Sequence, residues 1–147
     1  MEKIVDAEAL IIDLRENNGG SPETVAFVAS YLFDRRILIN QIYRRSTDET
    51  TYYFAEPDTL DLRFGEDKPV YVLTSDQTFS AGEELAYDLQ SAHRAKTIGQ
   101  ATAGGAHPVR PFVVDDHLLI IIPAFKAINP YTHKNWEGTG VIPNHSI

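Results

Sequence analysis

The sequence contains no cysteine among its 147 residues. This absence excludes disulfide bonds, thiolate metal sites and a cysteine nucleophile, although it does not identify a compartment. The chain also lacks an excess of basic residues, because its formal net charge is −8 at pH 7. A nucleic-acid-binding surface is therefore not expected. No apolar run approaches the ~18 residues of a membrane-spanning helix, and no signal peptide is visible.

The composition is that of a globular protein, with 43% hydrophobic and 23% charged residues. The length is sufficient for one domain with its own core. Met1-Glu2-Lys3 is followed directly by sequence typical of a domain interior. We therefore expect residues 1–147 to form a single catalytic-domain fragment, truncated from a longer protein.

The first strand–turn–helix unit begins with the apolar run at residues 9–14. Such a run predicts a strand buried on both faces, near the middle of a sheet. Gly19-Gly20 follows and allows positive φ and close backbone approach. Ser21 is a suitable N-cap for a helix over residues 22–34. No G-x-G-x-x-G or Gly-Lys-Ser/Thr motif is present, so neither a nucleotide nor another cofactor is expected.

The second unit is the strand at residues 70–73 and a helix over residues 81–94, with Ser80 between them. The unpaired amides of the helix's first turn could stabilise an oxyanion that develops beside Ser80. The alternative is that Ser80 only caps the helix and Glu83 completes a capping box. The two units leave both interpretations open.

The rest of the chain adds extended segments and turns. We expect a β-hairpin at 37–55, a loop at 56–69, a strand at 95–99, a Gly-rich turn at 102–108, a second hairpin at 111–122 and a turn-rich tail at 129–144. Together these elements predict an α/β domain with β-α units, a mixed sheet and added β-hairpins. If the two strands are parallel neighbours, both turns lie at one edge, where open α/β sheets bind ligands.

Four motifs carry a resemblance to a known family. They are LIIDLRENNGG at 10–20, TFSAGEE at 78–84, IGQATAGG at 98–105 and WEGTGVIPN at 136–144. In this order they resemble the C-terminal processing (tail-specific) serine peptidases and their relatives, the tricorn core protease and interphotoreceptor retinoid-binding protein. The resemblance implies a crotonase-like or ClpP-like α/β fold.

The resemblance also implies roles for individual residues. Ser80 matches the nucleophile, and the amides of Ala81 and Gly20 match the oxyanion hole. Gly19 shapes the turn, while Glu83 and Thr102 match supporting positions. Glu137 matches a tail glutamate that assists a Ser-His pair in the tricorn-like branch. A Cβ at Gly20 is expected to crowd the turn.

The general base departs from the family pattern. Where Ser-Lys peptidases carry their lysine, this chain has Gly105. The tricorn-like branch takes its histidine from a strand upstream of residues 9–14, which this chain does not contain. We therefore expect the upstream part of the full-length protein to supply the base. His107 is the candidate substitute within the chain, and no pair of its histidines has metal-ligand spacing.

The resemblance implies a serine-type endopeptidase that acts on a polypeptide substrate, with the isolated chain inactive. The alternative is a module on the same fold that binds a hydrophobic ligand such as a retinoid or fatty acid. The resemblance alone suggests an extracytoplasmic location. Asp13 and Arg15 are expected to form a structural ion pair, and Trp136 to pack in the core.

Overall fold

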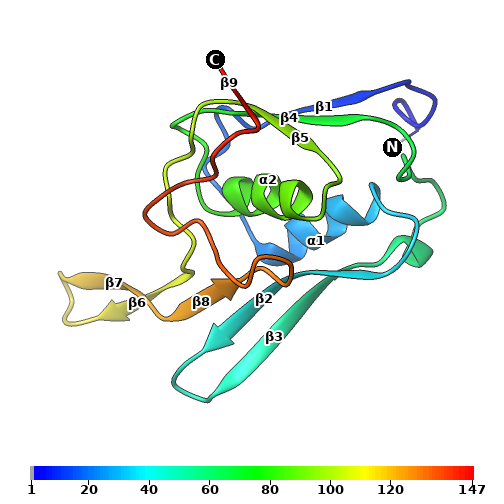
Figure 1. Ribbon diagram of the computed structural model, residues 1–147. Helices are drawn as coiled ribbons and strands as arrows, with labels where there is room; N and C mark the ends of the chain where they lie inside the picture. The colour runs from blue at the N-terminus through cyan, green and yellow to red at the C-terminus, as the bar shows by residue number, and fades with distance from the viewer. Residues whose placement is uncertain (1) are drawn as a thin grey trace.

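The computed structural model describes residues 2–147 and has two helices between two β-sheets (Figure 1). The elements in chain order are β1 (Leu10–Asp13), α1 (Pro22–Ser30), β2 (Ile37–Arg44), β3 (Glu49–Ala55), the 3₁₀ turn η1 (Pro57–Thr59), β4 (Val70–Thr74), α2 (Ala81–Ser91), β5 (Lys96–Gly99), β6 (Val109–Val113), β7 (Leu119–Pro123), β8 (Phe125–Ile128) and β9 (His145–Ser146). The predicted α/β class is confirmed. Parallel and antiparallel pairings lie in separate sheets rather than in one mixed sheet.

The parallel sheet has the order β1-β4-β5-β9. β1 pairs with β4 from Leu10 opposite Val70 to Asp13 opposite Leu73, so the two strands end together. The prediction that β1 is buried on both faces is wrong, because β1 is an edge strand of this sheet and Ile11 is 64% exposed. β4 and β5 occupy the middle of the sheet.

The antiparallel sheet has the order β3-β2-β8 and lies on the other side of the helices (Figure 1). The predicted hairpin forms β2 and β3, and β8 pairs with β2 on the side opposite β3. The chain therefore builds three layers: a parallel sheet, a helical layer and an antiparallel sheet.

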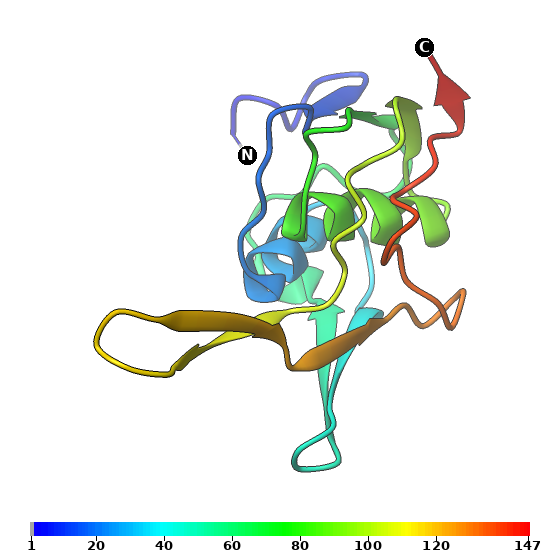
Figure 2. The same cartoon turned by 90° about the vertical axis from the view of Figure 1, so that its left-hand side faces the viewer.

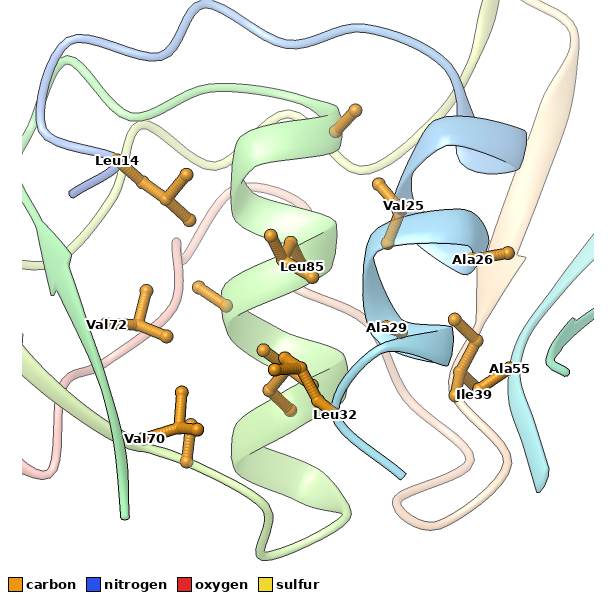
Figure 3. Packing of buried hydrophobic residues seen from close by; sticks show 14 of the residues in the cluster. Leu14, Val25, Ala26, Ala29, Leu32, Ile39, Ala55, Val70, Val72 and Leu85 are labelled. Atoms are coloured by element: carbon orange, nitrogen blue, oxygen red, sulfur yellow. The ribbon is translucent and has the colours of Figure 1, made fainter. Parts of the chain in front are cut away.

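The core fills the space on both sides of α2 (Figure 3). Leu85 of α2 lies between Val72 of β4 and Val25 of α1 in this view. Ile39 and Ala55 join the core from the antiparallel sheet. Trp136 is 1% exposed and packs in the same cluster, as expected. The tail is thus fixed to the body of the domain by its one indole ring.

α1 ends at Ser30, before the predicted boundary near Asp34. The amides of Tyr31 and Leu32 bond to carbonyls three residues back, which tightens the last turn. The Tyr31 carbonyl then accepts hydrogen bonds from Phe64 and Gly65, so a distant loop closes the helix end. Over residues 2–147, no helix has the length and apolar character needed to cross a membrane.

β6 and β7 form a separate two-stranded ribbon that projects from the body of the domain (Figure 2). Their pairing runs from Val109 opposite Pro123 to Val113 opposite Leu119, which confirms the second predicted hairpin. The ribbon starts directly after the Gly-rich turn at 102–108 and leads directly into β8. It therefore connects the candidate site to the antiparallel sheet.

Candidate active site

The two predicted turns meet at the carboxyl ends of β1 and β4. The Phe79 amide donates to the Asn17 carbonyl at 2.9 Å, and the Thr78 hydroxyl donates to the Leu14 carbonyl at 2.8 Å. A Cβ built on Gly19 would lie 3.2 Å from Ser80 Oγ. The expected juxtaposition of Gly19-Gly20 with Ser80 is therefore present.

Ser80 has an unusual backbone conformation, with φ 52° and ψ −119°. Positive φ is strained for a residue with a Cβ, and such strain clusters at functional sites. Ser80 immediately precedes α2, so its side chain lies beside the positive end of the helix dipole. A sharp strand-to-helix turn of this kind exposes a serine hydroxyl above a sheet edge.

The capping box expected from Ser80 and Glu83 is present at the start of α2. The Ser80 amide donates to Glu83 Oε2 at 2.8 Å. In the other half of the box, the Ser80 side chain faces the Glu83 amide. An N-cap residue ordinarily has extended backbone, whereas Ser80 has positive φ, so helix capping alone does not account for its strained conformation.

Gly19, rather than Gly20, is the glycine that the close approach requires. Gly19 has φ 112°, and its Cβ would lie 2.8 Å from Ser80 Cβ. A Cβ on Gly20 would make an ordinary contact of 3.9 Å with Ala81 Cβ. The steric crowding that was expected from a side chain at position 20 would therefore arise at position 19, where the chain lies closest to Ser80.

Glu83 is fully buried and joins the serine turn to the second Gly-rich turn. Besides the Ser80 amide, its carboxylate accepts hydrogen bonds from Thr102 Oγ1 at 2.5 Å and the Gly104 and Gly105 amides at 2.6 and 2.9 Å. These hydrogen bonds offset the free-energy cost of removing the Glu83 carboxylate from water. Glu83 and Thr102 consequently fix the position of Ser80 relative to the turn.

Glu137 holds the end of the same turn. Its Oε2 accepts hydrogen bonds from the Ala106 amide at 2.8 Å and the His107 amide at 3.0 Å. Next to it, Trp136 Nε1 donates to the Gly105 carbonyl at 3.2 Å. The tail therefore folds back over the turn, and Glu137 contacts backbone rather than solvent alone.

His107 lies between the side chains of Glu137 and Asn135. Its Nδ1 is 3.8 Å from Glu137 Oε2, and its Nε2 is 3.3 Å from Asn135 Nδ2. The Asn135 amide is oriented by a 2.7 Å bond from Nδ2 to the Ala127 carbonyl, so Nδ2 is a donor. A neutral His107 therefore accepts at Nε2 and carries its proton on Nδ1, facing Glu137.

Position 105 has no room for a side chain in this arrangement. A Cβ built on Gly105 would lie 2.2 Å from Phe79 Cε2. Phe79 precedes the serine, so its ring fills the space where the lysine of a Ser-Lys pair would begin. The structure thus agrees with the absence of that lysine from the sequence.

Asn17 also holds the two turns together, although no motif pointed to it individually. Its Oδ1 accepts from the Gly19 amide at 2.9 Å, while its backbone carbonyl receives the Phe79 amide. A Cβ on Gly82 would lie 2.7 Å from Asn17 Oδ1, so the side chain also packs on the start of α2. The Asn-Asn-Gly-Gly sequence was a usable signal, since Asn side chains commonly bond the backbone two residues on.

Asp13 and Arg15 form the expected ion pair beside the site. Arg15 Nε and Nη2 donate to the two carboxylate oxygens at 2.9 and 2.7 Å, and this pairing lowers the pKa of Asp13 to about 2. Both side chains are exposed, so the pair orders the loop surface more than it stabilises the fold. Across residues 2–147, no group of three or more His, Asp or Glu is arranged to hold a metal ion.

The sequence is similar to processing proteases. It is 28% identical over 141 residues to a carboxyl-terminal-processing protease of Synechocystis sp., covering 96% of this chain and 31% of that protein. The chain therefore spans about a third of the length of this relative.

Solved structures share the fold. The photosystem II D1 C-terminal processing protease superposes with a TM-score of 0.76 at 21% identity, over 95% of this chain and 34% of that one. Mature CPAF in complex with lactacystin gives a TM-score of 0.81 at 18% identity, over 98% and 41% of the two chains. The model of peptidase family S41 matches residues 1–147, and the chain belongs to this family.

Proposed function

We propose that this chain carries the nucleophile and oxyanion hole of a serine endopeptidase, with Ser80 as the nucleophile. The observation that carries the proposal is the strained, positive-φ Ser80 at the start of α2, packed against Gly19-Gly20. Membership of peptidase family S41 supports the same reaction class. The retinoid or fatty-acid alternative gains no support from the relatives described above.

In the proposed reaction, Ser80 Oγ attacks the carbonyl carbon of a peptide bond and its proton passes to a general base. The carbonyl oxygen becomes an oxyanion, which accepts hydrogen bonds from the amides of Ala81 and Gly20. These donors are fixed before the reaction by α2 and by the Gly19 turn, so little reorganisation is required. The amine then leaves with a proton, and water releases the acyl group from the serine.

Glu83, Thr102 and Glu137 have positioning roles in this proposal. Glu83 joins the Ser80 amide to those of Gly104 and Gly105, and Thr102 donates to its carboxylate. Glu137 holds the last part of the turn through two amides. Loss of these carboxylates would move the turn that borders the nucleophile.

We propose that the base comes from the upstream part of the full-length protein. The chain spans 31% of the Synechocystis relative, so most of such a protein lies outside it. The rival is His107, whose Nε2 would have to leave Asn135 before it could accept a proton from Ser80. The substrate would be a polypeptide, and a location outside the cytoplasm rests only on the family resemblance.

Labelling with a fluorophosphonate probe tests the proposal. The 147-residue chain should react slowly, because a positioned general base contributes ~10²–10⁴ to such reactions. A longer chain that includes the upstream part should label readily, and Ser80→Ala should abolish its labelling. Ser75→Ala, which changes another serine near the same sheet edge, is the matched control and should still label.

Two outcomes would contradict parts of this proposal. Strong labelling of the 147-residue chain that disappears in His107→Ala would make His107 the base. Failure of the longer chain to label, combined with tight fatty-acid binding, would favour a carrier instead of a peptidase.

A further inference from the structure

The β6–β7 ribbon exposes an unusual amount of apolar surface. β7 has the sequence Leu-Ile-Ile-Ile-Pro, and every residue of both strands is exposed. The large apolar side chains that project into solvent, between 43% and 76% exposed, are Val109, Phe112, Val113, Val114, Leu118, Leu119, Ile120, Ile121 and Ile122. Contiguous apolar patches beyond a few hundred Å² are rare on monomers and mark interaction sites.

Both faces of the ribbon are apolar. Residues opposite each other share a face, so Val113 and Leu119 lie on one face and Phe112 and Ile120 on the other. A continuous apolar run is typical of a strand that is covered on both sides. The ribbon therefore has the composition of an internal strand pair although, in the described chain, it is a separate two-stranded sheet (Figure 2).

The hydrogen-bond pattern identifies which residues point outward. The Val114 amide bonds to the Leu118 carbonyl, and the Ala124 amide bonds to the Pro108 carbonyl. Because hydrogen-bonded and non-hydrogen-bonded pairs alternate in an antiparallel ladder, the pair of Pro111 and Ile121 is non-hydrogen-bonded. The backbone groups of such a pair point away from the ribbon.

The same alternation makes the two outer edges different. On β6, Pro111 lies at the centre of the outward-facing positions and offers no N–H, so this edge is blunted. On β7, Leu119 and Ile121 both present an outward N–H and carbonyl, and Pro123 ends the series. β7 is therefore the edge that can accept another strand.

We propose that β7 pairs antiparallel with β7 of a second copy of this chain, forming a four-stranded sheet in the order β6-β7-β7-β6. A two-fold axis at Ile120 would pair Leu119 of each copy with Ile121 of the other. The outward N–H and carbonyl groups of both residues would then be satisfied. Because the pairing is isologous, the same patch is covered on both copies.

The charges at the two ends of the ribbon favour this antiparallel direction. The tip carries Asp115 and Asp116, whereas the base carries Arg110 and Lys126. An antiparallel dimer brings the acidic tip of each ribbon toward the basic end of the other. A parallel arrangement would bring like charges together.

The test is a pair of proline substitutions that remove one outward N–H each. Ile121→Pro acts on the β7 edge, and Val113→Pro is the matched control on the β6 edge. Both positions belong to non-hydrogen-bonded pairs, so neither change removes a bond within the ribbon. Sedimentation equilibrium of the 147-residue chain over a concentration series measures association, and circular dichroism verifies folding.

The wild type and Val113→Pro should form dimers, whereas Ile121→Pro should weaken the dimer at least ~10-fold, since the pairing loses symmetric hydrogen bonds on both copies. A wild type that is monomeric throughout would overturn the proposal. Equal weakening by both prolines would also overturn it, because association would then use the faces rather than the β7 edge. A monomer that binds extended apolar peptides at β7 would assign the edge to a peptide instead.

Discussion

The ring of Phe79 occupies the space in which a side chain at position 105 would begin. The distance from an ideal Cβ on Gly105 to Phe79 Cε2 is 2.2 Å, well inside van der Waals contact. The residue before the serine and the residue that replaces the family lysine are therefore coupled by packing. Gly105 does not need positive φ, so the restriction at this position is steric.

We expect Gly105→Lys to destabilise the chain by about 1 kcal/mol, the low end of the cost of overpacking, because the half-exposed Phe79 ring can move aside. Adding Phe79→Ala should recover most of that loss, because it removes the ring from the path of the new side chain. Phe79→Ala alone should cost little, since Phe79 is 46% exposed. Urea unfolding of the four proteins in a double-mutant cycle measures the coupling. Additive effects would show that the ring and the new side chain avoid each other.

The two neighbouring glycines should differ in their tolerance of alanine. Gly19→Ala places a Cβ at positive φ and 2.8 Å from Ser80 Cβ, so we expect a loss of about 2 kcal/mol or more. Gly20→Ala meets only Ala81 at 3.9 Å and should remain close to wild type in stability. Thermal unfolding by circular dichroism compares them. Equal melting temperatures would mean that the Gly19 turn can relax away from Ser80.

The sequence was most informative where local chemistry decides the structure. The ends of the two strands, the Gly-rich turn and the position of Ser80 before α2 followed from periodicity and turn residues. The edge position of β1 could not be obtained this way, because an apolar run indicates burial without identifying the strand's neighbours. Which strands lie beside β1 is decided by how the whole sheet assembles, and in the described sheet β1 pairs only with β4.

Within the candidate site, the least predictable feature was the use of Glu83. Its spacing from Ser80 predicted a local capping box, and the Ser80 amide does bond to it. Its three further donors come from residues 19 to 22 positions along the chain, so they depend on how the 102–105 turn packs on α2. Long-range contacts of this kind leave no periodic signal. The family resemblance was the only indication that Glu83 and Thr102 act together.

Glu83→Gln should be strongly destabilising although it is nearly isosteric. The glutamine NH2 group would face backbone N–H donors that now bond to a carboxylate oxygen, leaving at least one of them unsatisfied. Hydrogen bonds to a charged group contribute roughly 1.5–3 kcal/mol each, so a loss on the order of 2–4 kcal/mol is expected. Glu16→Gln, at an exposed position of the neighbouring loop, is the control and should change stability little. A Glu83→Gln protein that unfolds at the wild-type urea midpoint would remove Glu83 from this role.

A second pair of carboxyl groups on α2 should make stability depend on pH. Glu84 and Asp88 are one helical turn apart and buried, and Glu84 Oε1, Asp88 Oδ2 and Asn40 Nδ2 have no hydrogen-bond partner in the described structure. Burial raises the pKa of Glu84 to about 7. Burial, followed by the charge of Glu84, raises the pKa of Asp88 well above its usual value, and Asn129 opposes this through a 2.9 Å bond.

The sign of the effect follows from proton binding. Between the ordinary carboxyl pKa and the raised folded values, the folded chain keeps protons that the unfolded chain has lost. The contribution of these two groups to stability is therefore complete below the ordinary carboxyl pKa and is lost as pH rises through the folded pKa, by about 1.4 kcal/mol per pH unit for each proton retained. For Glu84 the decline should begin near its ordinary pKa of 4.5 and end near pH 7, and the charge of Glu23 adds to the rise in the Glu84 pKa.

Asp88→Asn should remove much of this decline. Its remaining side-chain oxygen can still accept from Asn129, and its new NH2 group can donate to Glu84 in place of the repulsion between two carboxylates. We expect the variant to gain about 1–3 kcal/mol over wild type at pH 8 and little at pH 5. Asp58→Asn, whose side chain is 87% exposed, should parallel the wild type at both pH values. Urea midpoints at pH 5, 6, 7 and 8 provide the comparison, and an Asp88→Asn curve parallel to wild type would show that the pair does not retain a proton in the folded chain.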